Sequence, residues 1–229
     1  ITAVILLVFR DTILGFVTGI HVSTSKNLKI GDWIGIPKYN IEGNIQDINL
    51  LTTKIVNFDK TISTIPTYDL LSTEIRNHQV MYEGSSRRIK RSIYFNIKSF
   101  KFVDDEFYEK VKDINLISEY LDRKLREIAE SKKNIPHAER IINGQQLTNI
   151  GLFRNYVLNY LKNNPKVDQD EIVLVRQLEI SPQGMPLEIY CFANKAELVD
   201  YERIQADIFD HILTAAQEFD LEIMQVAKA

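Results

Sequence analysis

An apolar stretch at the start of the chain is the feature that most limits what this sequence can fold into. Residues 1–22 read ITAVILLVFRDTILGFVTGIHV, and their only formal charges are the adjacent Arg10 and Asp11. A buried helix, a signal peptide and part of a membrane helix all carry runs of this kind. No basic segment precedes the run and no small-residue cleavage pattern follows it, which disfavours a signal peptide. The choice therefore lies between a buried helix and a membrane helix.

The charged pair divides this stretch into two parts. Ile1–Phe9 is uniformly apolar, but at about 1.5 Å per residue it forms a helix of roughly 13 Å, too short to cross a bilayer unaided. A charged pair in a membrane segment must face protein, water or the interface. Beyond it, Gly15 and Gly19 have a spacing that lets helices pack closely, although chance produces it often. We expect one membrane helix in two parts, with more of its first part upstream.

The remainder of the chain has the composition of a soluble globular protein. The 229 residues are 45% hydrophobic and 26% charged, with a net charge of −3. Plentiful aliphatic and aromatic residues exclude an extended disordered chain, and the slightly acidic balance gives no support to nucleic-acid binding. The single cysteine, Cys191, excludes a disulfide framework within the chain.

Strand-like runs dominate the chain from Gly31 to Pro66. Apolar and alternating segments fall at Gly31–Pro37, Glu42–Val56 and Thr61–Ile65, with turn residues between them. Three or four short strands in so few residues predict a small antiparallel barrel, because closure protects their edges.

Strands and helices alternate in the rest of the chain. Omitting an amphipathic helical insertion near 104–132, the order is strand, helix, strand, strand, helix, strand, which is the ferredoxin-like split βαβ order. This order predicts an α+β domain, a fold that selects no function by itself. The predicted elements, in the same order, are 93–102, 149–161, 172–180, 187–192, 201–219 and 221–226.

The sequence gives no sign of catalysis. It has no Gly-rich phosphate loop, HExxH, CxxC or nucleophile elbow, so we expect no enzyme, no catalytic residue, no cofactor and no metal. Asp207 and His211 stand one helical turn apart, a spacing that can orient an imidazole but more commonly gives an exposed surface pair. Cys191, between two aromatic residues in a strand, is expected to be buried rather than nucleophilic.

Four cations occur within five residues, at Arg87, Arg88, Lys90 and Arg91. Such a cluster binds phosphate groups of lipid or nucleic acid, or tunes the electrostatics of an ion path. The simpler interpretation is a solvated bend that pairs with nearby acids. These acids are Asp104, Asp105 and Glu106.

Long motifs in the chain resemble the small-conductance mechanosensitive channel (MscS) family. They extend over essentially the whole sequence, and within the family the likeness is to the miniconductance branch, represented by bacterial YbdG. The motifs are FRDTILGFVTGI, GDWIGIPKYNIEGNIQDINLLTTKIVNFDKTISTIPTYDLLSTEIRN, RRIKRSI, LTNIGLFRNYVLNYL and RQLEISPQGMPLEIYCFANKAELVDYERIQADIFDHI.

This resemblance implies a homoheptameric channel of the bacterial inner membrane, opened by membrane tension to release small solutes and ions on hypoosmotic shock. Its partners would be copies of itself, membrane lipids and the permeating solutes, and not nucleic acid. Residues 1–28 would form the pore-lining transmembrane helix and a kinked amphipathic continuation. Residues 29–78 would form the Sm-like β domain. Residues 79–229 would form the cytoplasmic α/β vestibule domain, with its insertion at about 104–132.

The resemblance also implies roles for single residues. A narrow apolar constriction gates by dewetting, and its candidates here are Ala3, Leu6, Leu7 and Phe9. Ala3 and Leu7 match the family's pair of apolar seal residues, although Ala3 is smaller than the usual leucine. Kinking and helix packing would involve Arg10, Asp11, Gly15 and Gly19, with Asp11 in place of the prototype's glycine at the bend. The segment TIPTYDLLS occupies the place of the family's IPN segment.

The alternative function is that of a soluble RNA-binding module. Small Sm-like barrels and ferredoxin-like sheets both occur in RNA-binding proteins, and the cations from Arg87 to Arg91 would hold the RNA. The negative net charge and the apolar start of the chain disfavour this alternative.

Overall fold

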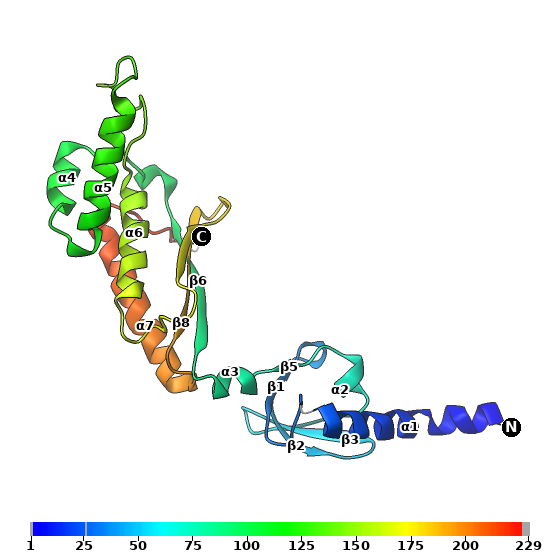
Figure 1. Ribbon diagram of the computed structural model, residues 1–229. Coiled ribbons are helices and arrows are strands. Elements are labelled where there is room, and N and C mark those ends of the chain that lie inside the picture. Colours follow the sequence, from blue (N-terminus) through cyan, green and yellow to red (C-terminus); the bar gives the residue numbers. More distant parts are fainter. Residues whose placement is uncertain (1, 26, 226–229) are drawn as a thin grey trace. The chain divides into compact units, whose positions relative to one another are not determined.

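The computed structural model describes residues 2–25 and 27–225, with the backbone alone for residues 2–6, 23 and 25. The chain divides into two compact units, Ile1–Gly84 and Ser85–Ala229. The first contains helix α1 and a β-sheet, and the second contains another sheet and the longer remaining helices (Figure 1).

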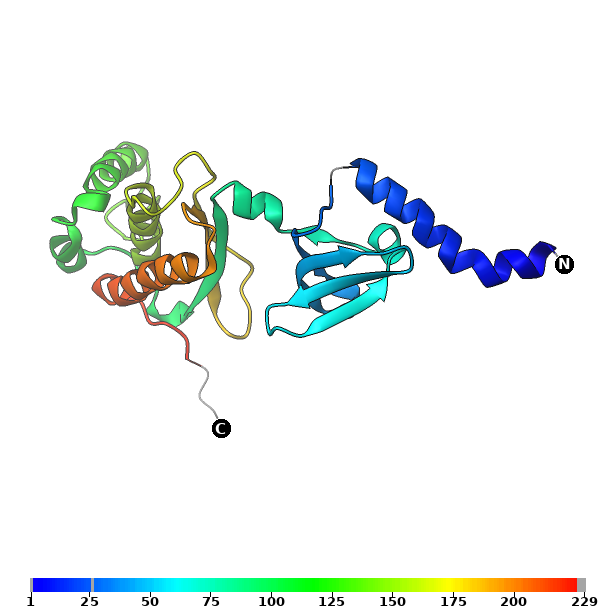
Figure 2. The same cartoon turned by 90° about the horizontal axis from the view of Figure 1, so that it is seen from below.

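Helix α1 runs from Thr2 to Ser25 without interruption. The expected division at Arg10 and Asp11 is therefore not a break in the helix. Figure 2 shows that the axis of α1 bends in the part of the helix near its N-terminus. Within residues 2–25 and 27–225, no helix combines the length and the apolar character that crossing a membrane requires. The transmembrane pore helix is thus not confirmed.

Five antiparallel strands form the sheet of the first unit, in the order β4-β3-β2-β1-β5. The predicted run Glu42–Val56 is two strands joined by a tight turn at residues 49–51, and the last strand, only two residues long, was not predicted. The strands are β1 (Trp33–Ile36), β2 (Ile41–Ile48), β3 (Thr52–Asn57), β4 (Ile62–Pro66) and β5 (Arg76–Asn77). Short helices η1 (Pro37–Tyr39), α2 (Asp69–Ser72) and α3 (Gln79–Glu83) connect or follow them.

The core of this unit lies on one face of the sheet. Alternation along β1 and β2 sends every second apolar side chain inward. Val22 of α1 joins this core, so the C-terminal part of α1 packs against the sheet. The buried core residues are Val22, Ile34, Ile36, Ile45, Ile55, Ile65 and Leu70.

The sheet of the second unit has the strand order β6-β8-β7, all antiparallel. Its strands are β6 (Arg87–Phe95), β7 (Leu174–Gln177) and β8 (Met185–Ala193). Helices α6 (Asn149–Lys162) and α7 (Leu198–Ala215) cover one face of it (Figures 1 and 2). Thr148 caps α6 by accepting a hydrogen bond from the backbone N–H of Gly151 (3.2 Å), which confirms the predicted start of that helix.

Two strand predictions for this unit were wrong in extent. The strand predicted at 93–102 is β6, which begins at Arg87 and ends at Phe95, because the Asn96 side chain caps the turn η2 (Ile97–Ser99). The strand predicted at 221–226 is reduced, in the described part of the chain, to a bridge between Ile223 and Phe95 on the outer edge of β6. With this bridge, the order around the sheet is the ferredoxin-like order.

The helical insertion consists of two helices where the sequence indicated one. They are α4 (Asp105–Val111), capped by Asp104, and α5 (Asn115–Lys132). The fully buried Asn149 fastens the segment before α4 to the start of α6 and to the turn η3 (Ala216–Phe219) that follows α7. Its side chain accepts from the N–H groups of Lys101 (3.0 Å) and Ile150 (2.9 Å) and donates to the carbonyls of Ser99 (2.9 Å) and Phe219 (3.1 Å).

Candidate functional site

The C-terminal part of α1 has its small residues on the inside and its large apolar residues on the outside. Gly15 and Thr18 are buried against the β domain, together with Val22. The opposite side presents large side chains that are about half exposed, namely Ile13 (47%), Phe16 (56%), Val17 (54%) and Ile20 (53%). A surface helix of a water-soluble domain shows the reverse arrangement. A contiguous exposed apolar face of this kind marks an interaction surface.

The two glycines of α1 have different surroundings. A Cβ atom added to Gly15 would lie 1.9 Å from the backbone oxygen of Leu50, in the turn between β2 and β3. A Cβ atom added to Gly19 would meet nothing within 4 Å. Within one copy of the chain, the close contact between α1 and this turn thus depends on the glycine at position 15.

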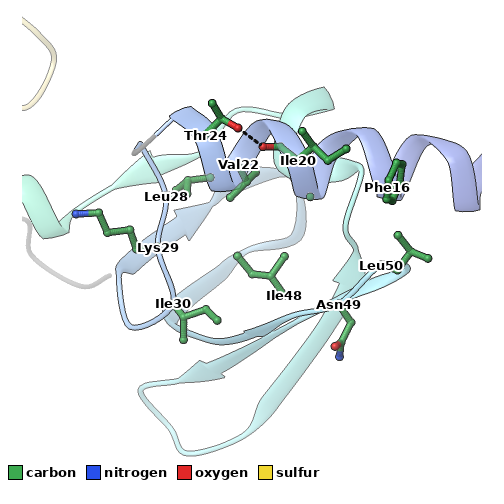
Figure 3. A pocket seen from close by; sticks show the side chains of 11 residues that line it. Phe16, Ile20, Val22, Thr24, Leu28, Lys29, Ile30, Ile48, Asn49 and Leu50 are labelled. Atoms are coloured by element: carbon green, nitrogen blue, oxygen red, sulfur yellow. Dashed lines mark hydrogen bonds between the residues drawn. The ribbon is translucent and has the colours of Figure 1, made fainter.

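A groove of about 660 Å³ separates the last turns of α1 from the edge of the sheet. Figure 3 shows side chains from α1, from the segment after it and from the end of β2 lining this groove. The lining is mainly apolar, and Lys29 is the charged residue in it. Its large apolar members are Phe16, Ile20, Val22, Leu28, Ile30, Ile48 and Leu50.

The candidate gate residues lie in the N-terminal part of α1. Leu7 and Phe9 are exposed at 73% and 53%, and Arg10 and Asp11 are exposed as well. The side chains of Ala3 and Leu6 lie outside the described part of the chain. A single copy of the chain brings none of the described gate candidates into a constriction.

Asp69 anchors the segment TIPTYDLLS, although it is a charged residue only 1% exposed. It accepts hydrogen bonds from the hydroxyl of Tyr39, from the hydroxyl of Ser72 (2.9 Å) and from Nζ of Lys38 (3.4 Å). Burial alone raises the pKa of Asp69, but these hydrogen bonds and the charge of Lys38 outweigh it and hold the pKa below its ordinary value. The carboxylate therefore stays ionised and ties η1 to α2.

Thr67 of the same segment is fully buried beside the turn that supports α1. Its hydroxyl donates to the carbonyl oxygen of Asn49 (2.7 Å), and its backbone N–H donates to the carbonyl oxygen of Leu51 (3.0 Å). The TIPTYDLLS segment is therefore hydrogen-bonded to the residues on both sides of Leu50, whose backbone oxygen contacts Gly15.

The four cations of β6 divide between the two faces of their sheet. Arg87 and Arg91 lie on the helix side, over the rings of Tyr201 (4.4 Å) and Phe209 (5.6 Å) of α7. Arg88 and Lys90 lie on the opposite side, since successive residues of a strand face opposite ways. There the Arg88 guanidinium lies 5.8 Å from the ring centre of Tyr190.

The carboxylate beside Lys90 is Glu188. The sequence had indicated Asp104, Asp105 and Glu106 as the partners of these cations. Glu188 is 4% exposed and receives Arg176 Nε (2.8 Å) and Nη2 (2.7 Å), with Lys90 Nζ at 3.8 Å. Both Arg176 nitrogens contact the same oxygen, Glu188 Oε1, and the charges of the two groups strengthen this contact. One acid within the apolar run LEIYCF is the sequence signal that could have predicted it.

The residues weighed for catalysis serve structural roles. Asp207 pairs with Lys166 (2.6 Å), whereas His211 Nε2 lies 2.7 Å from the Tyr156 hydroxyl and its ring stacks on Tyr160 at 4.1 Å. Burial raises the pKa of the Cys191 thiol to about 12, which suppresses its nucleophilic thiolate form. Among the described side chains, no group of three or more metal-ligating residues is placed to hold a metal ion.

Comparisons with known proteins agree with this architecture in both units. Residues 11–80 match the family "Mechanosensitive ion channel, beta-domain", and residues 138–223 match "Mechanosensitive ion channel MscS, C-terminal". The chain belongs to the MscS family. Members of this family are not enzymes, in agreement with the absence of catalytic motifs from the sequence. The matches do not single out the miniconductance branch.

Two relatives in the MscS family illustrate how much of a family member the chain represents. It is 24% identical over 208 residues to the low conductance mechanosensitive channel YnaI of Escherichia coli, covering 91% of this chain and 46% of YnaI. It is 35% identical over 71 residues to the small-conductance mechanosensitive channel MscMJ of Methanocaldococcus jannaschii, covering 31% of this chain and 20% of MscMJ. The chain thus spans less than half of either relative.

Solved structures show the same MscS-like fold. The chain aligns with MSL1 of Arabidopsis thaliana with a TM-score of 0.64 at 15% identity, covering 98% of this chain and 63% of MSL1. It aligns with the closed state of Helicobacter pylori MscS with a TM-score of 0.58 at 15% identity, covering 100% of this chain and 69% of that chain.

Proposed function

We propose that this chain is the pore end and the cytoplasmic part of a mechanosensitive channel in a bacterial inner membrane. Membrane tension opens the channel and releases ions and small solutes on hypoosmotic shock. Opening enlarges the in-plane area of the protein, so tension shifts the population toward the open state. Within the family, the motifs of the sequence favour the miniconductance branch.

The exposed apolar face of α1, seated on an MscS-type β domain, is the observation that carries this proposal. Residues 1–28 form the lower pore helix and its amphipathic continuation, which lies along the membrane surface with Phe16, Val17 and Ile20 outward. Residues 29–78 form the β domain, and residues 79–229 form the vestibule wall in the cytoplasm. Seven copies enclose the pore, and the unpartnered apolar face supports contact with lipids and neighbouring copies.

Ala3, Leu6, Leu7 and Phe9 are the proposed constriction, and Leu7 provides its most direct test. Patch-clamp recording of spheroplasts that express the full-length protein measures the pressure at which conductance appears. Leu7→Asn is expected to lower that pressure, because a polar ring hydrates more readily than an apolar one. Leu7→Ile, which keeps the site apolar, is the matched control. An unchanged threshold in Leu7→Asn shows that Leu7 does not face the pore, and absence of any pressure-evoked conductance contradicts the channel function itself.

The RNA-binding alternative is not favoured. Arg87 and Arg91 lie over aromatic rings of α7, and the pair Lys90 and Arg176 surrounds a buried carboxylate. These cations are engaged within their own domain.

A further inference from the structure

Three strands of the first unit place opposite charges on either side of a glycine. Arg76 of β5 is the register partner of Gly35 of β1, and Gly35 is in turn the partner of Glu42 of β2. Adjacent strands lie about 4.8 Å apart, so the backbones of Arg76 and Glu42 are roughly 10 Å apart. The three residues lie on the face opposite to the core residues Ile34 and Ile36. Because Gly35 has no side chain, the ring of His78 lies in the space beside it and borders the gap between the cation and the anion.

Aromatic rings enclose this gap on one side. The backbone N–H of His78 donates to the backbone carbonyl of Trp33 (2.8 Å). A Cβ atom added to Gly35 would come within 3.0 Å of His78 Nε2. The Trp33 ring lies against His78 (centroids 5.0 Å) and meets the ring of Phe58 edge-on (5.3 Å). Trp33 Nε1 also donates to Glu42 Oε1 (3.1 Å), which orients that carboxylate.

The result is a pocket of about 560 Å³ with separated charges, a volume within the range of small-molecule sites, about 300–1,000 Å³. Arg76, whose Nε donates to Glu74 Oε1 (2.8 Å), and His78 line one side of it, and Glu42, Phe58 and Asp59 line the other. Both hydrogen bonds from Thr61 to Asp59, from the hydroxyl (2.6 Å) and from the backbone (2.9 Å), go to Oδ1 and lower the pKa of Asp59. The Asp59 carboxylate of the pocket therefore stays ionised.

We propose that this pocket binds a small zwitterion, namely a free amino acid whose carboxylate and ammonium groups are separated by a short carbon chain. The carboxylate pairs with the guanidinium of Arg76, and the ammonium group pairs with Glu42 and Asp59 beside the ring of Phe58. Gly35 lies in the floor of the pocket, and the close approach of the His78 ring explains a glycine within a strand, where it otherwise weakens packing. A simple cation or anion satisfies only one side of the pocket. This proposal does not depend on channel activity.

The experiment uses the single tryptophan of the chain, Trp33, as a reporter beside the pocket. The 229-residue chain is titrated with 4-aminobutyrate while tryptophan fluorescence is recorded, and binding is measured in parallel by isothermal titration calorimetry. Butyrate and butylammonium, which lack one charge each, are the matched probes at equal ionic strength. We expect saturable binding of 4-aminobutyrate in the millimolar range and at least tenfold weaker binding of either matched probe. Equal binding of one of them, or no saturable signal by either method, overturns the proposal.

Three substitutions localise the binding. Glu42→Gln keeps an acceptor for Trp33 but removes the charge, Arg76→Gln removes the cation, and Gly35→Ala fills the floor. Each is expected to weaken binding at least tenfold, whereas Lys54→Gln, an exposed cation elsewhere on the same sheet, leaves it unchanged. Far-UV circular dichroism checks folding, and if Gly35→Ala unfolds, the two charge variants decide the outcome. Unaltered affinity in both charge variants contradicts the assignment of the site.

Discussion

The Cα atom of Gly15 faces the backbone oxygen of Leu50 so closely that a Cβ atom there would stand 1.9 Å from that oxygen. Backbone atoms of a tight turn cannot yield as a flexible side chain does. The residue at position 15 therefore determines how closely α1 approaches the turn between β2 and β3.

Gly15→Ala is expected to push α1 away from this turn and to destabilise the first unit by about 1–3 kcal/mol, as overpacking of a close contact does. Gly19→Ala is the matched control, since its added Cβ meets nothing within 4 Å, and removal of a helical glycine stabilises by about 0.5–1 kcal/mol. Urea unfolding followed by Trp33 fluorescence, which reports on the first unit, measures both changes. Equal effects of the two substitutions would show that the contact with Leu50 is unimportant.

Asp69 is expected to make the stability of the first unit depend on pH. Its pKa in the native state is lowered, so its contribution is fully present above the unfolded value of about 4 and is lost as the pH falls through the native value. Asp69→Asn should cost about 1.5–3 kcal/mol at pH 7, the usual contribution of hydrogen bonds to a charged group, and the two proteins should converge in acid. Urea unfolding across this pH range tests this, and Ser72→Ala, which removes one donor, should give a smaller loss. A constant difference between Asp69→Asn and the native protein at all pH values contradicts the prediction.

Asn149→Ala is expected to destabilise the second unit by about 3 kcal/mol or more, because it leaves buried backbone groups on three segments without their partner. Thermal unfolding followed by far-UV circular dichroism measures the change. Asn163→Ala is the control, since this exposed side chain makes a single hydrogen bond, to the carbonyl of Asn159 (2.8 Å), at the end of α6. Similar losses for the two variants would mean that Asn149 does not join the insertion to the sheet domain.

The division of the β6 cations between two faces predicts different effects for two double substitutions. Arg88→Gln with Lys90→Gln is expected to shift the reversal potential in a salt gradient toward cations, if the open face of the sheet borders the ion path. Arg87→Gln with Arg91→Gln removes the contacts with Tyr201 and Phe209 and is expected to lower thermal stability with little effect on ion preference. Patch-clamp recordings and thermal unfolding of both variants give the comparison. Unchanged reversal potentials in the first variant indicate that these cations serve pairing alone.

The strands and helices with regular apolar patterns could be predicted from the sequence. Alternation along Trp33–Ile36 and the cap at Thr148 specify their elements locally, so no knowledge of distant partners is required. The basic run Arg87–Arg91 lies in β6 rather than in a solvated bend, and its partners belong to β8 and α7 rather than to the acids near Asp104. These partners are distant in the sequence. The last predicted strand, in its described residues 221–225, forms a bridge to β6 through Ile223 and Phe95.

The sites depend on register and close approach, which a single sequence does not reveal. The contact between Gly15 and Leu50 joins a helix to a turn, and the row Arg76, Gly35 and Glu42 arises because three short strands align without a shift. A glycine inside a strand pattern was the available signal for a close approach at Gly35. The spacing of Gly15 and Gly19 indicated packing between helices, which one copy of the chain does not test; within the chain, Gly15 instead makes a close contact with a turn.

The small residues on the inner side of α1 also determine the free energy that is required to separate this helix from the sheet. Val22 is the residue that α1 contributes to the buried core in the described part of the chain. Gly15 and Thr18 carry little apolar area, so separating them from the sheet exposes little new surface to water. The isoleucines of this core all belong to the strands of the sheet. We therefore expect a pull along α1 to separate the helix from the β domain before it unfolds that domain.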